Sequence, residues 1–259
     1  MIRPAAPTGG ARITAVTSGK GGVGKTFTTA NLAASLSRLG RRVLVLDADL
    51  GLANLDVVLN LPAKVTLHEV FTGKARLEEA LLPAPGGFTA LLAGSGMVEY
   101  SRLTPEVRER LQRLLETVRP HFDHVLLDTG AGISDVVLYT VSLADEVLIV
   151  TTPEPTALTD AYATIKVLAT TQGRRELRLV VNQVQKAGEG RQVRAQLQQV
   201  VDRYVTPGLD GPVRLDFLGE VPADVSVRDA VRRRQLLLEC FPGSSAAVAV
   251  VAVATRMAD

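Results

Sequence analysis

Residues 12–26 read RITAVTSGKGGVGKT, and this stretch indicates the fold more strongly than any other. An apolar, β-branched run over 13–17 has the composition of a buried strand, and a helical spacing of apolar residues follows over 26–39. Between them lies a loop in which Gly19, four further residues and the triplet GKT at 24–26 satisfy the general phosphate-loop pattern. We therefore expect a strand, a phosphate-binding loop and a helix in direct succession.

The residue types of this loop suit the phosphates of a nucleotide. Glycines let backbone amides turn toward one anion and approach it closely, and the N-terminus of the following helix adds a favourable dipole. Lys25 is expected to bridge the β- and γ-phosphates, and the Thr26 hydroxyl to coordinate Mg²⁺. The alternative is a glycine-rich turn without a ligand, which the flanking strand and helix disfavour. The expected phosphate-contacting residues are Gly19, Lys20, Gly21, Gly22, Val23, Gly24, Lys25 and Thr26.

Apolar strand patterns alternate with helical patterns along the rest of the chain. This alternation predicts right-handed crossovers and a parallel sheet, and strands that are apolar throughout are buried on both faces. The predicted fold is a single-domain α/β P-loop NTPase with a doubly wound, mostly parallel sheet flanked by helices. We expect a flexible tail over 1–11 and one domain over 12–259. The expected strands cover 13–17, 43–46, 88–93, 124–127, 146–151, 178–182 and 216–219, and the expected helices cover 26–39, 105–118, 135–142, 156–171, 191–204, 226–234 and 244–257.

The composition suits one large cytosolic domain. The 259 residues carry a formal net charge of +2, so no global field calls for nucleic acid or an anionic membrane. Cys240 is the only cysteine, which excludes an intramolecular disulfide and a thiolate metal cluster. The first ten residues lack the apolar core of a signal peptide. The longest apolar run, 246–254, is far shorter than the ~20 residues of a spanning helix.

Two acidic stretches are expected at the carboxyl edge of the sheet, where ligands bind in such folds. Residues 47–56 read DADLGLANLD and follow an apolar strand, so Asp47 and Asp49 are expected just past its end. Residues 125–132 read VLLDTGAG, in which Asp128 ends the strand in the manner of a Walker B carboxylate. Such carboxylates orient an attacking water or hold Mg²⁺ through water. The alternative for Asp47 and Asp49 is loop solvation or a helix cap.

A second lysine, Lys20, lies inside the loop, where an ordinary phosphate loop does not need one. Taken by itself it is a solvated cation beside phosphate. The arrangement KGGVGKT over 20–26 resembles the deviant Walker A ATPases of the MinD/ParA group. That resemblance implies a slow switch that hydrolyses ATP to ADP with Mg²⁺. It also implies a homodimer that sandwiches two ATP molecules, with Lys20 crossing the interface.

The resemblance assigns roles to further positions. The catalytic residues are expected to be Lys20, Lys25 and Asp49, with Asp49 positioning the attacking water. Asn54 falls where the group has a switch residue near the γ-phosphate. The expected metal ligands are Thr26, and, through water, Asp128 and Asp47.

The adenine end is expected at two strand ends. In the group, an Asn after one strand and a Pro-containing turn after the next frame the base. Asn182, Pro222 and Asp224 stand at the matching places. The alternative is an Asn cap and a routine turn.

Three stretches resemble one branch of the group, the FlhG (FleN) regulators of flagellar number and placement. They are DADLGLANLDVVLNL at 47–61, DTGAGISD at 128–135 and PEPTALTDAYATIK at 153–166. This branch implies protein partners in the flagellar or polar machinery, and a cytoplasmic location with peripheral association at the inner membrane or cell pole. The alternatives are a MinD-type division-site regulator and a ParA-type partitioning ATPase that binds DNA.

Both ends of the chain and one basic cluster bear on these alternatives. The first ten residues lack the Asp-Gln-Ala motif with which many FlhG proteins stimulate the GTPase FlhF. The run SSAAVAVVAVATRMAD at 244–259 has no polar face or basic stripe, so we expect a docked last helix rather than an amphipathic membrane anchor. Arg228 and Arg232 share a helix face, with Arg233 and Arg234 beside them, and form either a solvated face or a DNA-binding patch.

Overall fold

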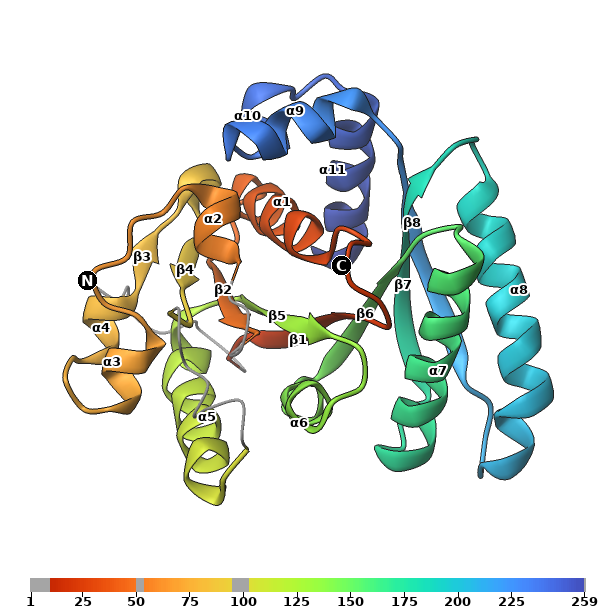
Figure 1. Cartoon of the computed structure of the whole chain (residues 1–259), viewed down its shortest axis with the longest axis horizontal. Coiled ribbons are helices and arrows are strands. Elements are labelled where there is room, and N and C mark those ends of the chain that lie inside the picture. The colour runs from red at the N-terminus through yellow and green to blue at the C-terminus, as the bar shows by residue number, and fades with distance from the viewer. Residues whose placement is uncertain (1–9, 50–53, 95–102, 259) are drawn as a thin grey trace.

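The computed structural model describes residues 10–49, 54–94 and 103–258. Its strands are β1 (Arg12–Ser18), β2 (Val43–Ala48), β3 (Leu82–Pro83), β4 (Thr89–Leu91), β5 (His124–Ala131), β6 (Glu146–Thr151), β7 (Glu176–Val184) and β8 (Arg214–Pro222). They form one sheet in the order β3-β4-β2-β5-β1-β6-β7-β8 (Figure 1). Among these described strands all neighbours are parallel except β3 and β4, which are antiparallel. The expectation of a doubly wound, mostly parallel sheet is confirmed.

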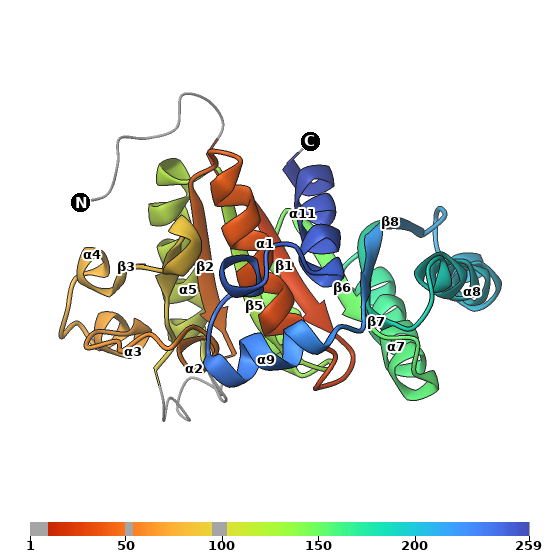
Figure 2. The same ribbon diagram turned by 90° about the horizontal axis from the view of Figure 1, so that it is seen from above.

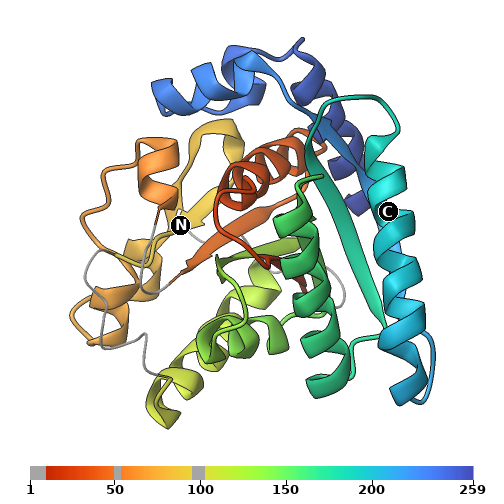
Figure 3. The ribbon, with the colours of Figure 1, turned by 45° about the vertical axis from the view of Figure 1, so that its right-hand side comes forward.

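Helices cover both faces of the sheet. They are α1 (Lys25–Arg38), α2 (Leu55–Leu59), α3 (Leu67–Phe71), α4 (Leu77–Ala80), α5 (Pro105–Val118), α6 (Asp135–Ser142), α7 (Pro155–Thr171), α8 (Glu189–Tyr204), α9 (Val225–Arg233), α10 (Leu237–Cys240) and α11 (Ser245–Ala258). Figure 1 shows α1, α9, α10 and α11 on one side of the sheet and α5 to α8 on the other. Each side has its own apolar core, built mainly from Leu, Val, Ile and Ala. Figure 3 shows α7 and α8 side by side.

Local sequence explains where the main elements begin and end. All six residues of β2 are buried, as expected for a central strand that is apolar nearly throughout. Helix α1 ends at Arg38, and Gly40 follows with a φ of 81°, a conformation that glycine adopts without strain. Helix α5 begins with Pro105 behind Thr104, whose hydroxyl accepts a hydrogen bond from the Val107 amide.

Two strands extend further than the sequence patterns indicate. Asp47 was expected just past the end of its strand and Asp128 at the end of its strand, but both lie inside their strands and are 1% and 2% exposed. They are also register partners on β2 and β5. Loop solvation is therefore wrong for Asp47, because both strands keep their hydrogen bonds beyond the last apolar residue.

The segment from residue 54 to 94 contains structure that the apolar pattern did not predict. Three short helices, α2 to α4, precede the antiparallel pair of β3 and β4. The Pro- and Gly-rich stretch 83–87 (PAPGG) is also ordered: Pro83 lies in β3 and a 3₁₀ turn covers Pro85–Gly87. A Cβ atom on Gly86 would lie 2.6 Å from the Ala34 Cβ, so this turn packs tightly on α1.

The last helix is docked on the rest of the domain, as expected. Helix α11 packs against α1 and β8, and its Met257 carbonyl accepts a hydrogen bond from Arg12 Nη1 at 3.3 Å. Figure 2 shows α11 beside α1, while α9 lies near the end of α1 where the phosphate loop joins it. Within the described ranges, the structure has no helix of the length and apolarity that crossing a membrane requires.

Candidate nucleotide-binding site

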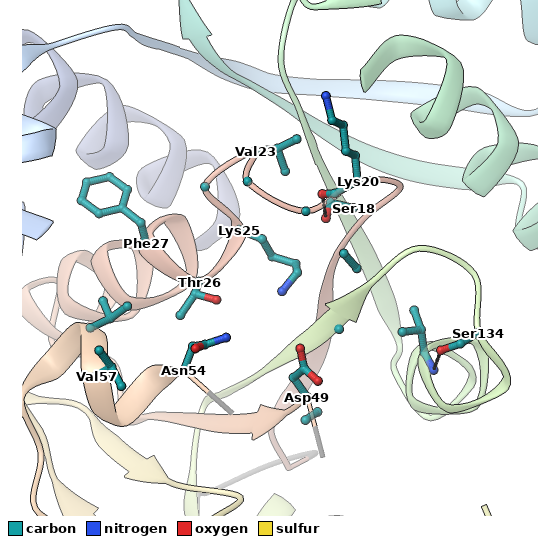
Figure 4. A pocket seen from close by; sticks show the side chains of 18 of the residues that line it. Ser18, Lys20, Val23, Lys25, Thr26, Phe27, Asp49, Asn54, Val57 and Ser134 are labelled. Atoms are coloured by element: carbon teal, nitrogen blue, oxygen red, sulfur yellow. Dashed lines mark hydrogen bonds between the residues drawn. The ribbon is translucent and has the colours of Figure 1, made fainter. Parts of the chain in front are cut away.

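A cavity of about 860 Å³ opens where β1, β2 and β5 end. The phosphate loop forms one wall, and residues that follow β2 and β5 form the opposite wall (Figure 4). Its polar lining includes several of the expected site residues. Of the predicted residues, Lys20, Gly21, Gly22, Val23, Gly24, Lys25, Thr26, Asp49 and Asn54 line this cavity.

The glycines of the loop meet specific steric demands. Gly22 and Gly24 have φ angles of 83° and 87°, in the left-handed region that favours glycine. Gly19 does not line the cavity; its Cα faces the backbone of Asp160 in α7 so closely that a Cβ would collide with the carbonyl. The Ser18 hydroxyl donates a hydrogen bond to the Lys20 carbonyl at 2.9 Å and braces the turn. The loop is therefore shaped before any ligand arrives.

Lys25 points into the cavity (Figure 4), and it is paired with Asp128. Its Nζ lies 3.3 Å from Asp128 Oδ1, and the two side chains are 10% and 3% exposed. The Thr29 hydroxyl, one helical turn after Lys25, also donates to Asp128 Oδ1 at 3.1 Å. Breaking a buried pair of this kind without a replacement partner is costly. A phosphate that takes Lys25 must therefore be accompanied by a cation or proton for Asp128.

Asp47 lies beneath the cavity, and its carboxylate accepts hydrogen bonds from the backbone of the segment that follows β2. Its Oδ1 accepts from the Asp49 amide at 3.2 Å, and its Oδ2 accepts from the amides of Asn54 and Leu55, each at 3.2 Å. Burial, together with the charge of Asp128, raises the pKa of the Asp47 carboxyl to about 7. The surroundings of Asp47 therefore destabilise the ionised form of its carboxyl.

These buried groups fit a hard divalent cation. Asp47 and Asp128 are neighbouring buried carboxylates, and carboxylate oxygens are ligands that Mg²⁺ accepts. Thr26 lines the cavity and is positioned at the start of α1. Asp47, Asp128 and Thr26 thus stay the predicted metal-binding residues, the carboxylates through water.

Asp49 and Asn54 face the loop across the cavity (Figure 4). Asp49 rests against the end of β5, just before the turn at Gly132, and a Cβ on Gly130 would lie 3.5 Å from its Oδ1. That turn is tied to the phosphate loop, because the Gly132 amide donates to the Ser18 carbonyl at 2.8 Å. Both acidic stretches thus converge on one place, although 50–53 lie outside the described residues.

Lys20 is held by its own chain at the mouth of the cavity. Its Nζ lies 3.2 Å from Glu154 Oε2 and donates to the Thr156 hydroxyl at 2.9 Å. Both partners belong to the N-terminal turn of α7. The Lys20 side chain is 39% exposed, so this surface pair adds little stability.

A second cavity, of about 500 Å³, adjoins the first and shares Gly24, Phe27 and Val231 with it. Asn182, Pro222 and Asp224, the three residues expected at the adenine end, all line this second cavity. The structure thus separates the predicted residues into a phosphate half and a second half that is large enough for a base.

The side chains of Asn182 and Asp224 also have structural partners. Asn182 Nδ2 donates to the Val23 carbonyl at 2.8 Å, which braces the phosphate loop from β7. Asp224 caps α9 through the Ser226 amide at 2.9 Å and accepts from the Ser245 hydroxyl at 2.8 Å. These hydrogen bonds lower the pKa of the Asp224 carboxyl to about 2.

Sequence reasoning missed several residues of the site. Thr29, Glu154 and Thr156 contact expected site residues, while Phe27 and Val231 line both cavities. Thr29 had a usable signal, because spacing four from Lys25 puts both on one face of α1. Phe27 lies on α1 directly after the phosphate loop, whereas Glu154, Thr156 and Val231 are brought in from the start of α7 and from α9 and carry no local motif.

Comparison with known proteins agrees with this geometry. Residues 10–258 match the ParA family model, described as NUBPL iron-transfer P-loop NTPase. Antiactivator FleN of Pseudomonas aeruginosa is 43% identical, with 95% of this chain and 86% of FleN covered. The flagellum site-determining protein YlxH of Helicobacter pylori is 34% identical, with 90% of this chain and 77% of YlxH covered.

Solved structures show the same fold. The cell division ATPase MinD of Pyrococcus furiosus has a TM-score of 0.77 at 27% identity, with 95% of this chain and 98% of that chain covered. The septum site-determining protein MinD of Pyrococcus horikoshii OT3, in complex with Mg-ADP, has a TM-score of 0.74 at 27% identity, with 95% and 96% covered. By its phosphate loop, its paired carboxylates and this likeness along nearly its whole length, the chain belongs to the ParA/MinD family of P-loop ATPases.

Proposed function

We propose that this ATPase is a switch whose ATP-bound form is a homodimer, and that its cellular role is to control the number or placement of flagella. The observation that carries the switch is Lys20, a second loop lysine at the mouth of the cavity that is held by Glu154 and Thr156. The likeness to FleN and YlxH over most of the chain supports the flagellar role.

In the proposed reaction the loop amides and Lys25 hold the β- and γ-phosphates of ATP. Lys25 exchanges Asp128 for phosphate oxygens, and Asp128 and Asp47 then hold the waters of the metal site. Bound Mg²⁺ neutralises charge on the phosphate oxygens. Asp49 orients the attacking water from across the cavity. Positioning and charge stabilisation account for the reaction without a covalent enzyme intermediate.

The surroundings of the cavity support a second copy as the partner. Val57, Ile133 and Val231 are 49%, 45% and 45% exposed, and Val57 and Val231 line the cavity itself. Exposed apolar side chains that ring a polar site are typical of interaction surfaces. In the proposed dimer, Lys20 leaves Glu154 and reaches a phosphate bound by the other subunit.

The dimer is tested by changing Lys20 in a background that cannot hydrolyse ATP. Asp49→Ala protein should give an ATP-dependent dimer by size exclusion with light scattering. Adding Lys20→Ala should leave a monomer that still binds ATP through Lys25. Adding Lys166→Ala, an exposed lysine on α7, is the matched control and should leave the dimer intact. A stable ATP-dependent dimer without Lys20 would refute the cross-interface role.

The adenine assignment is part of this proposal. Asn182, Pro222 and Asp224 line the second cavity beside the phosphate loop, which supports placing the base there. Replacing Asn182 by Ala should weaken tripolyphosphate binding, because its amide braces Val23 in the loop, and should weaken ATP binding further, because the contact with the base is lost as well. An unchanged tripolyphosphate affinity would contradict that brace.

The flagellar role is tested by complementation. Expression of this chain in a Pseudomonas aeruginosa strain that lacks FleN should restore the normal number of flagella, counted by electron microscopy. The Lys20→Ala chain should fail at equal expression, because it cannot form the dimer. Restoration by Lys20→Ala, or failure of the unaltered chain, would count against the proposal.

Localisation is proposed to follow the nucleotide state through a protein partner of the flagellar or polar machinery. Cosedimentation of the Asp49→Ala protein with anionic liposomes, in ATP and in ADP, separates this from direct membrane binding. Pelleting only with ATP would assign localisation to lipid. Dimer formation without pelleting would support the protein partner.

A further inference from the structure

The basic cluster near the C-terminus is not one uniform surface. Both Arg228 and Arg232 are exposed, but Arg228 lines the 500 Å³ cavity beside the phosphate loop, whereas Arg232 lines neither cavity. Arg233 lies over the Phe241 ring, 5.1 Å from its centroid, and Arg234 ends α9 with a φ of 52°. The four arginines therefore have different surroundings, and Arg228 alone of this cluster faces the second half of the nucleotide site.

The other polar side chains of this cavity are already engaged. Asn182 donates to Val23 and accepts from the Gln183 amide at 2.9 Å. Asp224 accepts hydrogen bonds at the starts of α9 and α11. Gln183 makes a long contact from its Nε2 to the Gly22 carbonyl, at 3.5 Å. Arg228, by contrast, makes no hydrogen bond, ion pair or ring contact with any residue in the described part of the chain.

The walls around Arg228 suit a flat, largely apolar ligand. Phe27, Pro222, Val227 and Val231 line the same cavity, and it joins the phosphate half through Gly24. A guanidinium is planar, weakly hydrated and able to stack on an aromatic face, which an ammonium cannot do. This cavity is apolar, contains an unengaged guanidinium and lies next to the phosphate loop. The base of a bound nucleotide matches all three features.

We propose that Arg228 is a nucleobase-contacting residue, in which the guanidinium closes the second cavity over the base. This assignment rests on the proposed nucleotide-binding function and deepens it. It removes Arg228 from the surface patch considered for DNA and gives it a role in the affinity for ATP. The remaining arginines of the cluster are not part of this site.

The attachment of α9 gives the proposal a second consequence. In this helix, which is described in full, Ala230 is the buried residue, while Val225 and Val231 are 65% and 45% exposed. The Asp224 cap holds its first turn. A base held between Arg228 and the opposite wall adds a contact in the middle of the helix. Binding of the base therefore slows local opening of α9, whereas binding of phosphates alone does not.

The experiment compares ATP with inorganic tripolyphosphate, which has the phosphates but no base or ribose. Affinities of both, with Mg²⁺, are measured by calorimetry for the unaltered chain, Arg228→Ala and Arg232→Ala. Arg228→Ala should weaken ATP about two- to fivefold, the scale of a cation–aromatic contact at an exposed site, and leave tripolyphosphate unchanged. Arg232→Ala, one turn further on the same face, should change neither. Amide hydrogen exchange over 225–233 should slow with ATP and not with tripolyphosphate.

The outcomes separate the assignment from the function on which it rests. An unchanged ATP affinity in Arg228→Ala overturns the assignment. An equal loss of tripolyphosphate affinity, or an equal effect of Arg232→Ala, also overturns it, because the arginines would then act through general electrostatics. If the unaltered chain binds neither ligand, the proposed nucleotide-binding function itself fails. Tripolyphosphate binding by Arg228→Ala also shows that this variant is folded.

Discussion

Replacing Asp47 by Asn should change how the stability of the metal-free protein depends on pH. The Asp47 carboxyl is 1% exposed, and burial beside Asp128 raises its pKa from 3.8 to about 7. Between these two values the folded chain holds a proton that the unfolded chain has lost. The free energy of unfolding therefore falls as the pH rises through this window. The destabilisation is absent below about pH 4 and complete above about pH 7.

The size of the effect follows from the shift. A pKa difference of about 3 corresponds to roughly 4 kcal/mol, with a slope of about 1.4 kcal/mol for each pH unit. The carboxamide of Asp47→Asn would not titrate, but its NH₂ group would face the Asn54 and Leu55 amides from which Asp47 now accepts hydrogen bonds. That mismatch costs about 1–3 kcal/mol at every pH. Between pH 5 and pH 7 the variant should thus gain about 2 kcal/mol of stability relative to the unaltered chain, on top of the constant cost of the mismatch.

Urea unfolding in EDTA, between pH 5 and pH 8, measures this difference. Asp229→Asn, which alters an exposed carboxylate of α9, is the control and should run parallel to the unaltered chain. At pH 8, Mg²⁺ should stabilise the unaltered chain more than Asp47→Asn, because the ion pairs with the ionised carboxylate. If the free energies of unfolding of Asp47→Asn and the unaltered chain changed in parallel from pH 5 to pH 8, burial would not destabilise the ionised Asp47 carboxylate. That result would refute the reasoning.

Three further predictions concern other residues. Lys25→Ala should abolish tight ATP binding in a calorimetric titration, since its ammonium is the buried cation of the phosphate half; an unchanged affinity would reject that role. Asp49→Ala should bind ATP normally but hydrolyse it at least about 100-fold more slowly, and normal phosphate release would exclude it as the water-positioning group. Asp224→Ala should lower the free energy of unfolding by about 1–2 kcal/mol through loss of the α9 cap, while Ser245→Ala removes one of its partners and should cost less. Because the pKa of Asp224 is lowered to about 2, this stabilisation is present above about pH 4 and is lost as the pH falls through 2, which acid unfolding of both variants would reveal.

Local patterns determined much of this protein before its tertiary structure was considered. The strand, loop and helix around 12–38 follow from glycine spacing and from a helix N-terminus that favours an anion. The alternating apolar patterns located the long helices, and α5 and α6 have the bounds that the sequence predicts. Periodicity and capping act between residues a few positions apart, so they are visible in the sequence itself.

The pairing of distant residues depended on the tertiary structure. Asp47 and Asp128 are register partners, and the pKa of Asp47 follows from that pairing and not from any local motif. Lys20 meets Glu154, and Arg228 lines the second cavity, because α7 and α9 are packed beside the phosphate loop. These contacts join segments from separate crossovers of the sheet. Their geometry exists only after the two apolar cores have closed, so no pattern within one segment encodes it.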